Sequence, residues 1–342
     1  MPQQVSSTAI SDCQGGHRAL FRRADRRLAY SAKRVWMIDA AQNIARMGQG
    51  ELLPDVLGSP IDTSVLKSVY RRSFGLDVER FFPKAAVVLK RNPSHSFYQF
   101  ESAQPGDDRF YAELMGRIGY DDGEKAEFVA AAKFVATSET VLDIGCGPGR
   151  FADYCKSAVY KGVELNPDAV AEARREGRNV VLEPMEDQPT SGFDVVTLFQ
   201  VLEHVPNPEA FFAEAARCVA DNGYLIVSTP DMDGHIGHET NHILNYPPHH
   251  LSWWSAKSIS SMMHASGFEV VEVWREPLQS FHVHNWISSV INPRGQDHFV
   301  STLRSRVLNI VAKVAARLVR PFYRPVPYLT GQCVMVVGRR RT

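Results

Sequence analysis

The sequence lacks several features that would place it in other classes of protein. It has no run of about 18 apolar residues, so no membrane-spanning helix is expected. Its formal net charge is zero, which gives no overall indication of nucleic-acid binding. Its five cysteines are widely spread and form no CxxC, which argues against a disulfide framework or a thiolate zinc site. The polar start, MPQQVSSTAISDCQGG, has no apolar signal core, so we expect a cytoplasmic protein.

The length and composition that remain indicate a soluble protein with a real core. The 342 residues, 44% hydrophobic and 22% charged, suffice for one large domain or two ordinary ones. We expect a disordered segment over 1–20, a helical or irregular cap segment over 21–120 and one domain over 121–342. Residues 17–50 are basic with a helical period, which fits a solvated helix face or a binding patch. Residues 51–110 show no clean period, so we expect irregular chain with short strands such as KAAVVLK.

The region after Asp121 alternates short apolar strands with amphipathic helices of about 10–15 residues. This alternation predicts an α/β fold with a Rossmann-like, mostly parallel sheet covered by helices on both faces. The last strand, QCVMVVGRR, is expected at an edge of the sheet, after a helical insertion at about 295–325. The other strands are expected at 140–145, 160–165, 179–183, 193–199, 223–229 and 268–274, and the helices at 123–136, 149–158, 167–177, 207–220 and 255–267.

A glycine-rich stretch, VLDIGCGPGRF, lies between the first of these strands and the next helix. Gly145, Gly147 and Gly149 allow the backbone to turn tightly and to approach a ligand without Cβ clashes. Glu164 ends the next strand, where a carboxylate can accept hydrogen bonds from both hydroxyls of a ribose. Dinucleotide sites use G-x-G-x-x-G, whereas this loop is G-x-G-x-G with Asp143 before it, which favours a ligand that has an amino-acid end and no phosphate. A tight turn without a ligand is the alternative.

Together these motifs resemble the class I S-adenosylmethionine-dependent methyltransferases, over about residues 123–342. VLDIGCGPGRF resembles the first motif of that family, FDVVTLFQVLEHVPNPEAFF the fourth, and VADNGYLIVSTPD the fifth strand with its preceding turn. The resemblance implies a seven-stranded sheet and S-adenosyl-L-methionine as cofactor. Many relatives carry Asp-Ala at the adenine position, where Pro184 and Met185 stand here. The residues that the resemblance places at the cofactor are Asp143, Gly145, Cys146, Gly147, Gly149, Glu164, Leu165, Met185, Glu186 and Gln200.

Candidate acid–base groups follow the fourth strand in QVLEHV, at the carboxyl edge where such sheets bind ligands. Glu203 and His204 fit catalysis, metal binding, or capping of the strand–helix turn. The stretch is similar to one in ubiquinone-pathway O-methyltransferases, in which a further acid and this Glu-His pair are associated with a divalent cation. Gln200 replaces that acid here, so we expect no metal.

The stretch LNYPPHHLSWWS resembles a PPHH stretch of the family and is expected to cover the acceptor. His249 and His250 join Glu203 and His204 as candidate catalytic residues, because a neutral imidazole can take a proton from a hydroxyl. The aromatic residues nearby fit either substrate contact or a core beneath the loop. The expected substrate contacts are Tyr246, Trp253, Trp254 and, from FYAEL in the cap segment, Tyr111.

Residues 238–242, HETNH, match the H-E-x-x-H signature of zinc hydrolases. That signature needs both histidines on one face of a long helix. Here a turn-rich stretch precedes it, and Pro247 and Pro248 follow within two turns. We interpret the match as coincidence, with a small structural metal site from His235, His238 and His242 as the alternative.

The insertion before the last strand is apolar and basic. From His298 to the end there are nine Lys or Arg and no Asp or Glu. An amphipathic helix over 302–320 fits contact with an anionic membrane or an anionic substrate, or simple packing on the domain.

These observations predict a methyltransferase that O-methylates a sugar or another small metabolite. The alternatives are a membrane-associated lipid or quinone methyltransferase and a non-catalytic protein that binds S-adenosylmethionine. The partner expected is a small-molecule methyl acceptor, and no nucleic acid. The oligomeric state does not follow from the sequence.

Overall fold

The computed structural model describes residues 57–118, 125–135, 140–155, 159–238, 242–291, 303–323 and 329–341. All of them belong to one compact unit, Gly50–Thr342. The disorder predicted over 1–20 and the basic helical stretch over 17–50 lie outside the described residues. The domain boundary expected near residue 120 stays a prediction.

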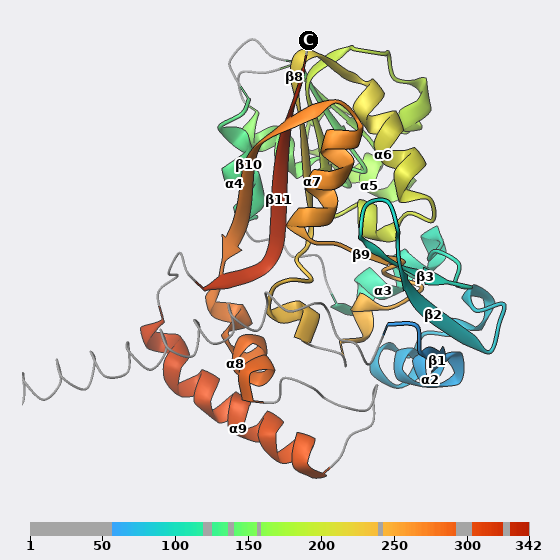
Figure 1. Ribbon diagram of the computed structural model, residues 1–342, viewed down its shortest axis with the longest axis vertical. Helices are drawn as coiled ribbons and strands as arrows, with labels where there is room; N and C mark the ends of the chain where they lie inside the picture. The colour runs from blue at the N-terminus through green and yellow to red at the C-terminus, as the bar shows by residue number, and fades with distance from the viewer. Residues whose placement is uncertain are drawn as a thin grey trace, which may run out of the picture. The chain divides into compact units, whose positions relative to one another are not determined.

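A seven-stranded, mostly parallel sheet forms the centre of this unit and confirms the predicted fold class (Figure 1). Its strand order is β10-β11-β8-β7-β4-β5-β6. β4 is parallel to β5 and β7, and β7 is parallel to β8, so the carboxyl ends of these strands meet at one edge. The strands are β4 (Thr140–Ile144), β5 (Val159–Val163), β6 (Val180–Val181), β7 (Phe193–Phe199), β8 (Val219–Pro230), β10 (Phe268–Pro277) and β11 (Thr330–Arg340).

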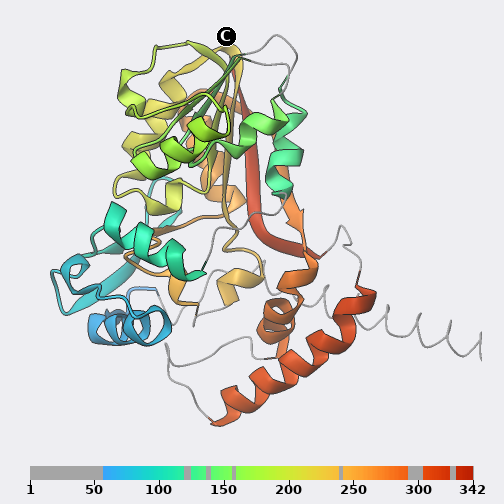
Figure 2. The same ribbon diagram turned by 180° about the vertical axis from the view of Figure 1, so that it is seen from behind.

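Helices cover both faces of the sheet because its strands bury side chains on both sides. Along β11, Val334 and Val336 pack into one core and Met335 and Val337 into another, as the two-residue period of a strand requires. Residues of α6 and α7 complete the first core, and residues of α4 and α5 complete the second. Figure 2 shows the ribbon from behind, with the green helices α4 and α5 toward the viewer. The helices are α4 (Ala126–Ala132), α5 (Pro167–Arg175), α6 (Pro208–Arg217) and α7 (Ala256–Ala265).

Two local predictions about this sheet are wrong. The last strand, β11, is not at an edge, because it lies between β10 and β8 and pairs antiparallel with both. Its residues from Cys333 to Val337 are buried, as expected for an interior strand that helices cover on both faces. The helix predicted over 149–158 is a five-residue 3-10 helix, η2 (Arg150–Tyr154). Gly149 precedes it in the left-handed conformation, and no side chain caps its first turn.

A second sheet joins the cap segment to the loop after β8. Its order is β1-β2-β3-β9, and every pair is antiparallel. The segment is therefore more regular than predicted for 51–110, a prediction that also missed a helix, α2. Asp62 caps that helix through the N–H of Ser64, and Gly75 ends it at φ 64°. The elements are β1 (Pro60–Asp62), α2 (Thr63–Phe74), β2 (Ala86–Arg91), β3 (Tyr98–Glu101), α3 (Asp108–Ile118) and β9 (Ser252–Trp253).

The insertion before β11 contains two helices, α8 (Val283–Ile291) and α9 (Leu303–Val319). α9 confirms the helix predicted over 302–320. Figure 1 shows α8 between α9 and the sheet. Within the described ranges, no helix combines the length and apolar character needed to cross a bilayer.

Candidate active site

The glycine loop follows β4 at the shared carboxyl edge. Gly145, Gly147 and Gly149 have φ angles of 64°, 54° and 68°, which glycine adopts at little cost. A Cβ on Gly145 would lie 2.9 Å from Cγ2 of Val201, and one on Gly149 would lie 2.5 Å from Cγ2 of Val180. A Cβ on Gly147 would meet no heavy atom within 4 Å. The loop is packed against the protein at both ends and open at Gly147.

Glu164 stands directly after β5 and faces this loop. Its Oε2 accepts a hydrogen bond from the N–H of Gly147 at 2.8 Å. Its Oε1 accepts from the N–H groups of Leu165 and Asn166 at 2.8 and 2.9 Å. These bonds fix the carboxylate beside the open side of Gly147. A fixed carboxylate next to a glycine cradle fits a nucleoside with two free ribose hydroxyls, so the residues present fit S-adenosylmethionine.

Asp143, at the end of β4, is buried beneath the loop. Its Oδ1 accepts from the Thr197 hydroxyl at 2.7 Å and its Oδ2 from the Tyr160 hydroxyl at 2.9 Å. Burial raises the pKa of the Asp143 carboxyl to about 6, against these two hydrogen bonds. The side chain therefore ties β4 to β7 and β5. Sequence reasoning missed Thr197 and Tyr160, and contact of Asp143 with the cofactor stays a prediction.

The other predicted cofactor residues lie along the same edge. Met185, in the 3-10 helix η3 (Met185–Asp187), is buried in the core that α6 and α7 share. Glu186, next to it, is exposed, and so is Leu165, at 65%. Cys146 is half-buried in the glycine loop, and burial raises the pKa of its thiol. The cofactor contacts of these four residues stay predictions.

Gln200 follows β7 in the left-handed conformation, at φ 58°. Its Nε2 lies 3.4 Å from Oγ of Ser228 and 3.3 Å from Sγ of Cys333. For a residue with a Cβ this conformation costs about 1 kcal/mol, and such strain concentrates at functional sites. Ser228 and Cys333 were not predicted, because neither belongs to a local motif.

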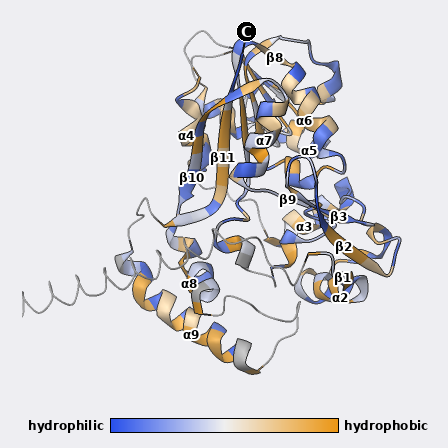
Figure 3. Cartoon of the chain, in the orientation of Figure 1, coloured by the Kyte–Doolittle hydropathy of each residue, from blue (hydrophilic) through white to orange (hydrophobic). Residues whose placement is uncertain are grey.

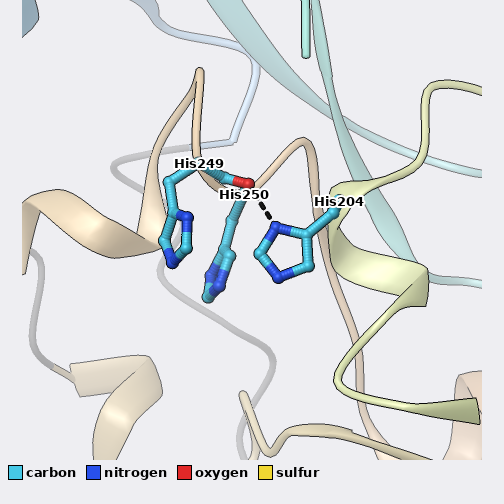
Figure 4. Close-up of side chains that lie close together, drawn as sticks. All are labelled: His204, His249 and His250. Atoms are coloured by element: carbon cyan, nitrogen blue, oxygen red, sulfur yellow. Dashed lines mark hydrogen bonds between the residues drawn. The ribbon is translucent and has the colours of Figure 1, made fainter. Parts of the chain in front are cut away.

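Three predicted catalytic histidines meet at this edge of the sheet (Figure 4). His204 comes from the 3-10 helix η4 (Leu202–His204) after β7, and His249 and His250 come from the loop after β8. The ring centroids of His204 and His249 are 4.8 Å apart, and those of His204 and His250 are 4.9 Å apart. The Leu251 N–H donates to the Glu203 carbonyl at 2.7 Å, which joins the two loops.

The backbone of His249 sets the tautomer of His204. Nδ1 of His204 lies 2.6 Å from the His249 carbonyl oxygen. A carbonyl oxygen can only accept, so we assign the proton of the neutral ring to Nδ1 and the lone pair to Nε2. The Tyr111 hydroxyl donates to the same carbonyl at 3.3 Å and lies 3.1 Å from the same Nδ1. Tyr111, predicted as a substrate contact, therefore supports the orientation of His204.

Burial keeps this cluster neutral. It lowers the pKa of His204 to about 4, although the hydrogen bond to His249 opposes the shift. It also lowers the pKa values of His249 and His250 well below the usual value, and the nearby His242 contributes to both shifts. The physical cause is the loss of water around the charged imidazolium. At neutral pH the cluster therefore offers uncharged nitrogen lone pairs.

Glu203 lies next to this cluster and is only 1% exposed. Its Oε1 is 3.8 Å from Nε2 of His204. Neither carboxyl oxygen has a hydrogen-bond partner within the part of the chain that the structure describes. Burial raises the pKa of the Glu203 carboxyl to about 8. A carboxyl buried in this way costs stability, and such groups occur preferentially at functional sites.

The same imidazoles are possible metal ligands. One nitrogen from each of His204, His249 and His250 lies within 4.8 Å of the others. Imidazole nitrogens bind zinc at about 2.0–2.1 Å, so they would have to approach each other to share an ion. The absence of a metal, expected from the sequence, stays a prediction.

The aromatic residues predicted as substrate contacts lie in the core. Tyr246, Trp253 and Trp254 are 0%, 4% and 1% exposed. Both indole N–H groups donate to acceptors in the same loop. Trp254 also stacks on Phe97, which was not predicted, with the ring centroids 4.4 Å apart. This packing supports the alternative that they fill the core beneath the loop, and their contact with an acceptor stays a prediction.

The HETNH stretch does not lie on a long helix in the described residues. His235–His238 form a four-residue 3-10 helix, η5, and residues 239–241 lie outside the described part. His242 precedes another short 3-10 helix, η6 (Ile243–Asn245). The alternative metal site of His235, His238 and His242 stays a prediction.

Comparison with known proteins agrees with this geometry. A family model described as a methyltransferase domain matches residues 115–273. A mitochondrial ubiquinone biosynthesis O-methyltransferase of Candida albicans is 32% identical over 111 residues, which cover 28% of this chain and 34% of that protein. The ubiquinone biosynthesis O-methyltransferase of Idiomarina loihiensis is 34% identical over 100 residues, which cover 26% of this chain and 41% of that protein. The chain therefore spans less than half the length of these curated relatives.

Among solved structures, a SAM-dependent methyltransferase from Archaeoglobus fulgidus is similar, with 19% identity and a TM-score of 0.44, over 63% of this chain and 92% of that chain. The strand order, the glycine loop and the acid after β5 define a Rossmann-like cofactor-binding protein. Residues 115–273 therefore match a methyltransferase domain, and the fit of the glycine loop and Glu164 to S-adenosyl-L-methionine agrees with that match.

Proposed function

We propose that the protein is an enzyme that transfers the methyl group of S-adenosylmethionine to a hydroxyl of a sugar or another small metabolite. One observation carries the proposal. The glycine loop with Glu164 and the cluster around His204 lie at the same carboxyl edge, after the neighbouring strands β4, β5 and β7. This arrangement supports a methyl-donor site and a proton acceptor that lie side by side, as transfer to a hydroxyl requires.

The residues divide the work between holding the two substrates and moving one proton. When bound, S-adenosylmethionine supplies a methyl group activated by its sulfonium. Gly147 and Glu164 would hold its amino-acid and ribose parts. Nε2 of His204 would take the proton of the acceptor hydroxyl, while the His249 carbonyl keeps Nδ1 protonated.

Glu203 provides the charge that this step needs. An imidazolium buried at His204 is unfavourable, as its lowered pKa indicates. An ionised Glu203, 3.8 Å from Nε2, would stabilise that cation. A protein that only binds the cofactor has no use for a buried carboxyl of this kind, so Glu203 supports an enzyme over a non-catalytic interaction protein.

A lipid or quinone acceptor is the second candidate. The curated relatives are named ubiquinone biosynthesis O-methyltransferases. A hydroxyl on a phenolic ring needs the same proton acceptor, so His204 and Glu203 serve either acceptor. The identity of the acceptor therefore has to be tested directly.

Titration calorimetry with S-adenosylmethionine tests the first half of the proposal. Glu164→Ala should weaken binding about 10- to 100-fold, because hydrogen bonds to a charged group are worth about 1.5–3 kcal/mol. Glu269→Ala, which changes an exposed glutamate on β10, is the matched control and should bind like the wild type. Absence of binding by the wild type would refute the proposal. Methyl transfer measured against sugar, phenol and quinol pools then separates the two acceptor classes.

A further inference from the structure

The second helix of the insertion, α9, presents its large apolar side chains outward. Six of them, which we call the α9 stripe, are at least half exposed: Leu303 (79%), Val307 (50%), Ile310 (62%), Val311 (50%), Val314 (54%) and Leu318 (69%). Their spacing confines them to an arc of about 100° on the helix. A helix that packs on a soluble domain normally turns such a stripe inward, so this arrangement calls for a partner.

The opposite face of α9 is the one that packs against the protein. Ala312 and Ala316 are 0% and 5% exposed. Asn309 accepts a hydrogen bond from the Ser288 hydroxyl of α8 at 3.2 Å. The helix is thus attached through small and polar side chains, and the α9 stripe remains on the outside. Figure 3 shows the hydrophobic positions that continue along α9.

Positive charge flanks the α9 stripe. Arg306, Lys313 and Arg317 are exposed and follow one side of it along the helix, and Arg320 comes directly after. The chain has no acidic residue from His298 to its end. A second copy of α9 would bring the same positive charges, and residues 17–50 are basic too. Charge therefore favours a partner that is apolar and anionic at once, which describes the surface of an anionic lipid bilayer.

We propose that α9 lies in the headgroup region of an anionic membrane, with the α9 stripe among the acyl chains and the flanking cations at the phosphates. Long basic side chains can cover apolar surface while their charged ends stay in water, which suits this geometry. The proposal goes beyond the proposed function, because it holds for a sugar acceptor as well as for a lipid-borne one. Its failure would leave binding of S-adenosylmethionine unaffected.

Flotation of the full chain with vesicles tests the membrane surface. Wild-type protein should float with vesicles of phosphatidylcholine and phosphatidylglycerol, and at least tenfold less with phosphatidylcholine alone or in high salt. Val307→Ser/Ile310→Ser/Val314→Ser should reduce flotation at least tenfold. The control, Val159→Ser/Leu182→Ser/Val271→Ser, removes side chains that are 69%, 51% and 46% exposed elsewhere and should float like the wild type.

A charge variant and a folding check complete the experiment. Arg306→Gln/Lys313→Gln/Arg317→Gln should abolish the preference for anionic vesicles. Every variant should keep the affinity of the wild type for S-adenosylmethionine in calorimetry, which shows that the domain is folded. The proposal is overturned if the wild type does not float, or if the α9 triple-serine variant floats equally well. A concentration-dependent dimer that only the α9 variants lose would overturn it too, in favour of a second copy of the chain.

Discussion

The imidazole of His204 is held by the backbone of His249, whose carbonyl oxygen lies 2.6 Å from Nδ1. The two residues are 45 positions apart and come from loops after different strands. The bond orients Nε2 without using a charged partner, and burial keeps the ring neutral. It also makes the position of His204 depend on the fold of the loop after β8.

Replacing His204 should abolish most of the transfer and leave cofactor binding intact. A general base contributes about 10²–10⁴-fold, so His204→Ala should lower kcat by that factor in a methyl-transfer assay. The control is His264→Gln, which changes an exposed histidine near the end of α7. Wild-type turnover in the His204 variant would exclude this residue as the base.

The rate should rise with pH because of Glu203. Burial raises the pKa of this carboxyl to about 8, so it is mostly protonated at pH 7 and ionised at pH 9. If its negative charge stabilises the His204 imidazolium, kcat/KM should increase about tenfold between pH 7 and 9. Glu203→Gln, which is of similar size and cannot ionise, should lower the rate and flatten the profile. If kcat/KM of Glu203→Gln still increased tenfold between pH 7 and 9, the increase would belong to another titrating group.

Removal of divalent metal should not change the activity. The tautomer of His204 leaves Nε2 available as a base, and that role does not require an ion. We expect equal rates before and after dialysis against EDTA, measured with and without added Mg²⁺, Mn²⁺ or Zn²⁺. A rate that disappears with EDTA and returns with one ion, together with one bound ion per chain by elemental analysis, would assign His204, His249 and His250 to metal ligation instead.

The folded state should lose stability in mild acid. The pKa of His204 is lowered from about 6.5 to about 4, and those of His249 and His250 are lowered as well. In the unfolded chain these histidines become protonated below about pH 6.5, whereas in the folded chain His204 becomes protonated only near pH 4. The free energy of unfolding therefore falls as pH falls through that window. His204 alone contributes on the order of 3 kcal/mol.

Glu203 acts in the opposite direction, because its raised pKa reduces stability as pH rises from about 4.5 to about 8.

Urea unfolding at pH 7 and at pH 5 measures this effect. The wild type should be the less stable at pH 5, and the difference should shrink in His250→Gln. His264→Gln should show the same difference as the wild type. A pH difference in His250→Gln as large as that of the wild type would contradict the burial of the cluster.

Local patterns predicted the parts of the molecule that depend on neighbouring residues. Apolar runs identified the central strands, and the glycine spacing predicted a tight loop after β4, which Glu164 joins through the Gly147 N–H. The place of β11 was not predictable in this way, because pairing with β8 and β10 depends on contacts between distant residues. α2 was not predictable either, because its apolar pattern is short and lies between turn residues. The positions of Ser228 and Cys333 beside Gln200 also depend on contacts between distant residues.

The candidate site shows the same division. Motifs predicted that His204, His249 and His250 lie near the sheet edge. Only the fold shows that the His249 carbonyl binds the His204 ring. Tyr111 was expected at the acceptor. Its contact with His204 joins residues 93 positions apart, and its hydrogen bond to the His249 carbonyl joins residues 138 positions apart. The burial that raises the pKa of Glu203 cannot be predicted from the local sequence LEH.

The pairing of β3 with β9 has a mechanical consequence. Tyr98 and Gln99 lie opposite Trp253 and Ser252, and the Phe100 N–H donates to the Leu251 carbonyl. The segment that carries His249 and His250 is therefore bonded to β3 on one side. On the other side it is bonded to Glu203 through the Leu251 N–H. A displacement of this segment therefore requires either that β3 moves together with β9 or that the two strands separate. β3 is thereby coupled to the candidate catalytic histidines.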